Sequence, residues 1–419
     1  MASPTAEPPL PEEILEDIFL RIDEAADLAR AFAACISFRR LISAPRFLRR
    51  FRSLHRPPIL GCLTSQYPEF QPIDPPRRSA AASAALAQAA DVTFSFIKPR
   101  NNWIVCDVRD NRVLLAPLYD RPDPFEYLVI CDPLHRRYAT IPPIPGDLRP
   151  TSRERRLRPI EFEPFLHPAS EEDDAEHWPL RVICNVLYES KVATLVFSSD
   201  TGKWQAAATF SYKYAPFMRH YVHNCFYWTH SARDDVLTLN PCGMKFSVIY
   251  LPPALHVGRD VAIVNAGKDR LGFVTLGFEK VCLELYTKSM RNNGVGGEGW
   301  VHDKTIPLPI NCHWTMIGAR EGYLVLHGFE RGWFKMPKYS ETGPERQYFI
   351  VELKTLLVER LCVFKPIRHH SMRNNGVGGE GWAHDKTIPL PINCHWIMIG
   401  AREGYLVLHG LELDWFEMP

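Results

Sequence analysis

The chain has no long apolar run. Nothing in its 419 residues approaches the roughly 18 consecutive apolar residues that a membrane-spanning helix needs. The opening MASPTAEPPLPEEIL lacks the basic start and apolar stretch of a secretory signal. The 49 basic and 48 acidic side chains leave a formal charge of +1, so no overall attraction to nucleic acid or membrane is expected. We therefore expect a cytoplasmic or nuclear protein that binds neither.

The chain also lacks the motifs of metal sites and of common enzymes. Its 11 cysteines are scattered singly, without a Cys-x-x-Cys pair, which signals neither a zinc site nor a disulfide framework. Most should be buried thiols. No HExxH, GxSxG or phosphate-binding-loop signature occurs. We expect no metal, no cofactor and no catalytic site.

Some local patterns resemble sites but have simpler explanations. Residues 294–299, repeated at 376–381, fit GxGxxG, but Arg-Asn-Asn precedes them where a buried strand is needed, which favours a loop. Cys312 and His313 are neighbours on an expected strand and so point to opposite faces. The acidic run 171–176 is typical of a solvated loop. Five aromatic residues either line a recognition surface or fill the core: Trp103, Tyr227, Trp228, Trp314 and Tyr323.

The first fifty residues have the pattern of a small helical module. Pro11 suits a first helical turn, and acidic residues follow it near the positive end of the helix dipole. A second helix is expected after Asp23, and a third around Phe38 that ends at Pro45. Three helices this short bury little surface, so a protein partner that covers their apolar face is expected. The apolar residues of the first helix are Leu10, Ile14, Leu15, Ile18, Phe19 and Ile22.

The segment from Leu10 to Ile59 resembles the F-box, in particular the F-box of large plant families. The resemblance is carried by the opening Leu-Pro, by the Ile-Leu-x-x-Ile helix after it, by Asp-Leu-Ala-Arg at 27–30 and by residues 35–39. It implies docking on the Skp adaptor of a cullin–RING ubiquitin ligase, while the rest of the chain captures the protein to be ubiquitinated. The resemblance assigns adaptor contacts to Leu10, Pro11, Ile14, Leu15, Ile18, Leu28, Ala29, Cys35 and Phe38.

The module departs from the family at one position, and its charge is unevenly distributed. Phe38 stands where many F-boxes have tryptophan, which keeps an aromatic anchor but loses the indole donor. Charge is also asymmetric, because the acidic residues of the first sixty all lie at or before Asp27 and arginines follow. A solvated face or an acidic protein partner is the expected use of these arginines.

The remainder of the chain has the pattern of many short strands. Its 36 prolines disfavour long helices, and groups of three or four apolar or alternating runs recur every 40–60 residues or so. This cadence is typical of propeller blades, with a β-sandwich as the alternative, and it resembles the propeller-like regions behind plant F-boxes. We predict an α+β multidomain protein: a three-helix F-box at 8–56, a linker at 57–91 and a mainly antiparallel, propeller-like domain at 92–370.

One repeat is unmistakable. Residues 289–337 and 371–419 align without a gap and differ at six of 49 positions, which indicates a recent tandem duplication. Residues 347–364 should complete the sheet of the first copy, whereas 371–419 is a truncated copy. The copy either supplies strands that replace a missing blade or forms a surplus segment with exposed edges, and the second arrangement is slightly favoured.

The sequence thus predicts a substrate-recognition subunit of a Skp–cullin–F-box ubiquitin ligase whose β domain recruits a target protein. The alternative is a propeller that binds or hydrolyses a small molecule or glycan, with the helices as an internal cap. That alternative requires carboxylates that converge at the propeller axis and whose pKa values are driven apart.

Overall fold

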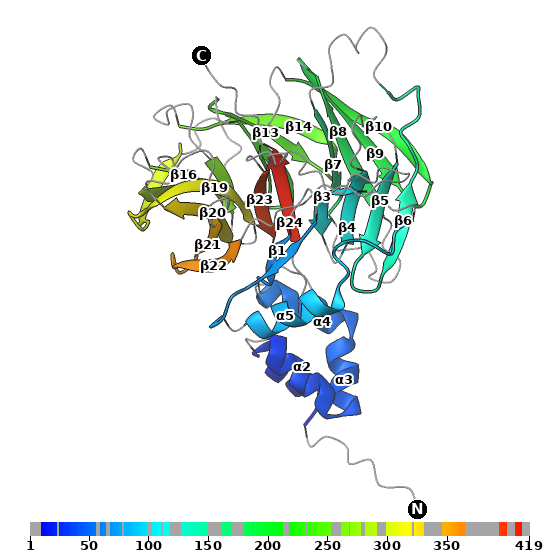
Figure 1. Ribbon diagram of the computed structural model, residues 1–419, viewed down its shortest axis with the longest axis vertical. Helices are drawn as coiled ribbons and strands as arrows, with labels where there is room; N and C mark the ends of the chain where they lie inside the picture. The colour runs from blue at the N-terminus through cyan, green and yellow to red at the C-terminus, as the bar shows by residue number, and fades with distance from the viewer. Residues whose placement is uncertain are drawn as a thin grey trace, which may run out of the picture.

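The protein consists of a few N-terminal helices followed by a five-bladed β-propeller, as the computed structural model shows (Figure 1). The propeller-like prediction is confirmed. The structure describes residues 10–22, 25–55, 59–63, 68–77, 79–98, 102–109, 112–117, 127–149, 161–168, 180–188, 190–212, 218–230, 233–252, 261–267, 269–277, 281–290, 299–320, 322–330, 346–364, 394–399 and 407–412.

The helical module contains a helix that the sequence did not predict. The third helix ends at Ser43, before Pro45, as predicted, but Pro45 also begins a fourth helix, because proline needs no backbone N–H partner in a first turn. Cys35 is the N-cap residue of the third helix, and its Sγ accepts a hydrogen bond from the Phe38 N–H at 3.5 Å. The four helices are α1 (Glu12–Leu20), α2 (Ala25–Ala34), α3 (Ile36–Ser43) and α4 (Pro45–Leu54).

The module has an apolar core of its own. Phe19 meets Phe38 edge to face with ring centroids 4.9 Å apart. Ion pairs join α1 to the later helices: Arg50 Nη1 lies 3.0 Å from Glu16 Oε1, and Arg40 pairs with Glu12. Part of the charge asymmetry is therefore satisfied within the module. The buried core residues are Leu15, Phe19, Leu20, Leu28, Ile42 and Phe47.

Each blade is a four-stranded antiparallel sheet formed by consecutive strands. Blade 1 contains β3 (Trp103–Arg109), β4 (Arg112–Pro117), β5 (Leu128–Asp132) and β6 (Arg137–Ile141), and blade 2 contains β7 (Glu161–Leu166), β8 (Arg181–Leu187), β9 (Lys191–Ser198) and β10 (Lys203–Ser211). Blade 3 contains β11 (Met218–Val222), β12 (Cys225–Thr229), β13 (Asp235–Asn240) and β14 (Lys245–Tyr250), and blade 4 contains β15 (Val261–Asn265), β16 (Arg270–Leu276), β17 (Cys282–Ser289) and β18 (Val301–Pro307). Blade 5 contains β19 (Cys312–Arg320), β20 (Tyr323–Glu330), β21 (Arg346–Glu352) and β22 (Val358–Phe364).

Apolar side chains fill the space between successive blades. One buried cluster joins blades 1 and 2, and others join blades 2 and 3, 3 and 4, and 4 and 5. The first strands of the sheets approach one another: β3 contacts β7, and β11 contacts both β15 and β19. These first strands therefore lie toward the centre of the ring. As predicted, β21 and β22 complete the sheet that β19 and β20 begin.

The ring is closed by residues from outside the five blades. The predicted linker contains β1 (Gly61–Leu63), β2 (Phe70–Pro72) and α5 (Ala80–Ala89), and its apolar side chains share one buried cluster with blades 1 and 5. In that cluster Leu60 packs with residues such as Trp103 and Val325. The backbone N–H of Asp74 donates to the Leu361 carbonyl of blade 5 at 3.2 Å. Residues 59–97 thus fill the space between the first and last blades.

The duplicated tail forms a hairpin beside this closure. β23 (Cys394–Ile399) pairs antiparallel with β24 (Val407–Glu412). β23 lies against β19 of blade 5, β24 lies against β3 of blade 1, and β1 contacts both (Figure 1). The hairpin therefore lies within the ring, at the junction of blades 5 and 1.

Ser83 holds the closing segment together. Its buried hydroxyl accepts from the Ile73 N–H at 2.9 Å and donates to the Leu60 carbonyl, which ties α5 to both short strands. Replacing Ser83 with alanine leaves two buried backbone groups without this partner, so we expect a loss of about 1–3 kcal/mol of unfolding free energy. Urea unfolding measures it, with exposed Gln88→Ala on the same helix as the control. Equal stability of the two variants would contradict the role given to Ser83.

Candidate docking surface and axial polar network

One face of α1 is apolar and exposed. Leu10, Ile14 and Ile18 are 41%, 47% and 45% exposed, and their spacing of four residues places them along one side of the helix. Pro11 beside them is also exposed. Leu15 and Phe19, on the inner side, are buried in the module core. The helix thus carries an apolar stripe, Leu10–Ile14–Ile18, that its own domain does not cover.

The other predicted adaptor contacts have different environments. Leu15 and Leu28 are buried in the module core, so they support the helices and do not form surface. Phe38 is half-buried against that core, and Cys35 is exposed. The side chain of Ala29 lies outside the described residues. Of the nine predicted adaptor contacts, four are therefore exposed and lie together on α1 and just before it: Leu10, Pro11, Ile14 and Ile18.

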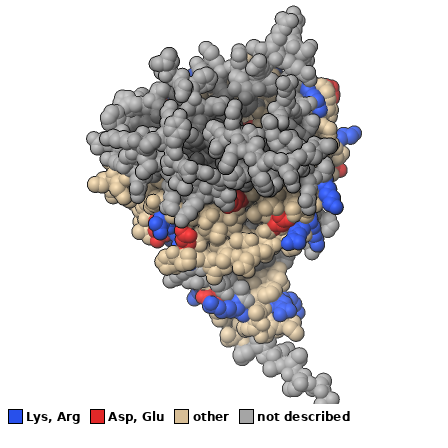
Figure 2. All heavy atoms as spheres, in the orientation of Figure 1, with Lys and Arg blue, Asp and Glu red and all other residues tan. Residues whose placement is uncertain are grey.

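Sequence reasoning missed a second exposed apolar group on the module. Ile36 is 81% exposed, because it is the first residue of α3 and no preceding turn covers it. Phe32, near the end of α2, is also exposed, and the Arg39 guanidinium lies 5.4 Å from its ring centroid. On the face shown in Figure 2, charged groups on the helical module alternate with uncharged surface.

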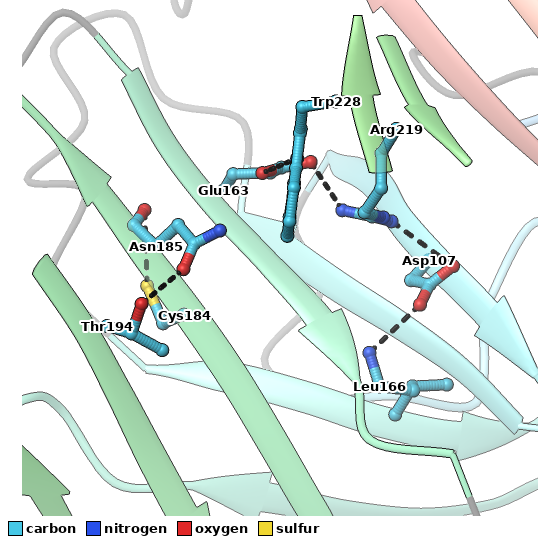
Figure 3. A network of polar contacts seen from close by, with 8 residues as sticks. All are labelled: Asp107, Glu163, Leu166, Cys184, Asn185, Thr194, Arg219 and Trp228. Carbon is cyan, nitrogen blue, oxygen red and sulfur yellow. Dashed lines mark hydrogen bonds and ion pairs between the residues drawn. The ribbon is translucent and has the colours of Figure 1, made fainter. Parts of the chain in front are cut away.

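A buried ion-pair network joins three blades. Arg219 of β11 lies between two carboxylates: Nη1 is 2.6 Å from Glu163 Oε1 on β7, and Nη2 is 3.4 Å from Asp107 Oδ1 on β3 (Figure 3). The backbone N–H of Leu166 donates to Asp107 Oδ2 at 2.9 Å. The indole N–H of Trp228 donates to Glu163 Oε2 at 2.8 Å. The first strands of blades 1, 2 and 3 are thereby cross-linked near the centre of the ring.

The charges of this network favour a structural role over proton transfer. Burial raises the pKa of Glu163, and the charge of Arg219 and the Trp228 hydrogen bond oppose that rise. Burial also raises the pKa of the neighbouring Cys106 thiol to about 12, so this thiol is uncharged at neutral pH. Both carboxylates contact the guanidinium, which leaves them less suited to proton transfer than a pair of opposed carboxylates.

A regular spacing in the sequence points to this network. Asp107, Glu163 and Arg219 follow one another at intervals of 56 residues, one on the first strand of each successive blade. The first strands of blades 1, 2 and 3 begin at Trp103, Glu161 and Met218, so a spacing of 56 residues places one network residue on each of them. β3 and β7 also carry Arg109 and Glu161, so without a known blade period nothing in the sequence distinguishes the three residues of the network as a motif.

The structure also shows the environment of the other residues singled out in the sequence. Trp103, Tyr227, Trp228 and Trp314 are buried and fill the core, and Tyr323 is partly buried. Six of the ten cysteines identified as free thiols are buried. Gly299 is the one described residue of the GxGxxG motifs, and the acidic run 171–176 lies outside the described residues. Within the described ranges, no cluster of His, Cys, Asp and Glu has the arrangement of a metal site, and no helix has the length and apolarity to cross a bilayer.

Comparison with known proteins gives similarity in structure alone. No protein-family profile matches the chain, and no curated protein matches it in sequence. Among solved structures, Kuenenia stuttgartiensis hydrazine synthase has 9% identity and a TM-score of 0.33, over 63% of this chain and 68% of that one. A chain of a nidogen/laminin complex has 11% identity and a TM-score of 0.36, over 74% of this chain and 93% of that one.

Arg219→Met should strongly destabilise the propeller. The substitution leaves two largely buried carboxylates without their shared cation, which costs about 3–5 kcal/mol of unfolding free energy. Chemical denaturation measures the loss. Exposed Arg137→Met on β6 is the matched control and should change stability by less than about 0.5 kcal/mol. A loss in Arg219→Met no larger than in this control would show that the network does not brace the blades.

His220 makes the propeller sensitive to acid. This histidine of β11 is buried, and burial, with a smaller effect of Arg219, lowers its pKa to about 3. Because the unfolded chain takes up the proton first, stability falls as the pH falls from about 6.5 toward 3, by up to about 1.4 kcal/mol per pH unit. His220→Leu should flatten this slope, measured by denaturation between pH 7 and 4.5, whereas exposed His302→Gln should not. An unchanged slope in His220→Leu would refute this assignment.

Proposed function

We propose that the chain is a substrate-recognition subunit of a Skp–cullin–F-box ubiquitin ligase. In this proposal the helical module docks on the Skp adaptor, and through it on cullin, while the propeller recruits the target protein. The observation that carries the proposal is the apolar stripe Leu10–Ile14–Ile18, exposed on a module that already has its own core. Its residues coincide with positions that the F-box resemblance assigns to adaptor contact.

The energetics of the stripe suit a protein partner. Covering three half-exposed aliphatic side chains contributes roughly 1 kcal/mol each. Exposed Phe32 and Ile36 extend the apolar surface beyond α1. Helices with a separate core can present these residues without unfolding, so little ordering cost accompanies docking.

The propeller is the proposed recruiting domain. Its fold provides a rigid ring whose loops and edges can bind protein, and the carboxylates near the centre are engaged by Arg219. We therefore propose a non-catalytic subunit without metal or cofactor, which acts in the cytoplasm or nucleus and contacts neither nucleic acid nor membrane. Bond chemistry would belong to other subunits of the ligase.

Docking should depend on the stripe. Ile14→Ala/Ile18→Ala removes apolar contact area without touching the module core, so the module stays folded while affinity for a purified Skp adaptor falls at least about tenfold, or about 1.4 kcal/mol. Isothermal titration calorimetry measures the affinity. Glu13→Ala, an exposed change on the same helix, should bind like the unaltered chain.

A second variant tests the same surface at its other end. Leu10→Ala/Pro11→Ala should also weaken adaptor binding, because both residues are exposed beside the stripe. If the unaltered chain fails to bind an adaptor that binds a known F-box protein, the proposal is refuted. If the Ile14→Ala/Ile18→Ala variant bound the adaptor at full affinity, the apolar stripe would not be part of the interface.

A further inference from the structure

The chain contains the same hairpin twice. Residues 312–330 form β19 and β20 of blade 5, and residues 394–412 contain β23 and β24. The two segments differ at two positions, Thr315 against Ile397 and Phe329 against Leu411. Their strands pair in the same register over most of their length, from Cys312 opposite Glu330 to Met316 opposite Leu326 and from Cys394 opposite Glu412 to Met398 opposite Leu408. Beyond this point β19 has a bulge that pairs Gly318 with Val325, whereas the second hairpin pairs Ile399 with Val407.

The differences avoid the buried positions of the first hairpin. Thr315 is partly buried, and the side chain of Phe329 lies outside the described residues. Each buried residue of this hairpin has the same residue type 82 positions later in the chain. These buried residues are Cys312, Trp314, Met316, Ile317, Gly318, Ala319, Leu324, Val325, Leu326 and Gly328. The second copy therefore has the side chains needed to pack in blade 5.

The special requirements of this position are also kept. A Cβ atom at Gly328 would lie 3.0 Å from the rings of Phe349 and Trp314, so the position requires glycine or a shift of those rings. The second copy has Gly410 there. The Trp314 indole N–H donates to the Pro309 carbonyl at 2.9 Å, and a tryptophan and a proline recur at the same spacing in the copy.

The second hairpin is also close enough to exchange. β23 lies against β19, the strand whose sequence it repeats. Residues 365–393 connect β22 to β23, and residues 331–345 connect β20 to β21. The longer connection is roughly twice the shorter, which disfavours the second copy by about a factor of three in equilibrium constant. The closure cost of the longer connection is therefore small and does not by itself exclude the second copy from this position.

We propose that residues 394–412 are a second occupant of the β19–β20 position. They can pair with β21 of the same chain, with Leu408 opposite Phe349 where Leu326 now lies, and thereby release residues 312–330. Blade 5 thus has two interchangeable inner hairpins and one acceptor edge, β21, among the described residues. Damage to the first copy shifts the population toward the second.

A double-mutant cycle in the full chain tests the exchange. Trp314→Ala and Trp396→Ala are made singly and together, and the Tm of each is measured. If either hairpin can fill blade 5, each single variant keeps one intact copy and loses little, whereas the double variant loses more than the sum, by at least about 5 °C. Leu326→Ala and Leu408→Ala provide a milder cycle if a tryptophan variant does not fold.

Hydrogen–deuterium exchange identifies the occupant directly. The Thr315/Ile397 and Phe329/Leu411 differences give the two hairpins peptides of different mass. In Trp314→Ala, amides of 394–412 should be more protected than in the unaltered chain, because β24 then also pairs with β21, while those of 312–330 exchange faster. A Trp314→Ala loss as large as that of the double variant, or strictly additive losses, overturns the proposal. Protection that appears with concentration-dependent dimers would overturn its intramolecular form.

Discussion

The structure depends on apolar contact between its first and last blades. A ring of sheets leaves one open junction, where the core-facing side chains of blades 1 and 5 would meet water. Here residues 59–97 fill that junction, and Leu60 and α5 pack in one cluster with both blades. The other four inter-blade clusters among the described residues join neighbours along the chain, whereas this one joins segments that are far apart in the sequence.

Closure of the ring by residues 59–97 also explains why the helical module keeps an exposed apolar surface. The segment after α4 is committed to the ring, whereas α1–α4 have a separate core and lie at one end of the molecule (Figure 1). Nothing among the described residues of the propeller covers Ile14 or Ile18, which remain nearly half exposed. A folded module with an uncovered apolar stripe, held on a rigid ring, has the exposed surface that the proposed adaptor docking requires.

Local patterns predicted the blades but not their junctions. Each sheet consists of consecutive strands, so alternation and turn residues were enough to find it. Residues 57–91 have turn-rich local signals, and their packing against Leu361 and Val325 depends on distant parts of the chain. Likewise Pro45 signals a helix end or a helix start equally well. The stripe on α1 was visible as periodicity, but sequence alone did not separate buried Leu15 from exposed Ile14.

The two copies of the repeat, residues 289–337 and 371–419, are nearly identical, and this bears on which of them can pack in blade 5. Selection for packing alone would preserve apolar character at positions such as Leu326 and Leu408, and would let surface positions diverge. Because 43 of the 49 positions are identical, including that of exposed Ile310, which recurs as Ile392, the copies have had little time to specialise. The second hairpin has the same residue type at each position that is buried in β19–β20, so it retains the residues needed to pair with β21. Its backbone nevertheless lies between β19 and β3. Its present position is therefore one of two that its sequence can satisfy.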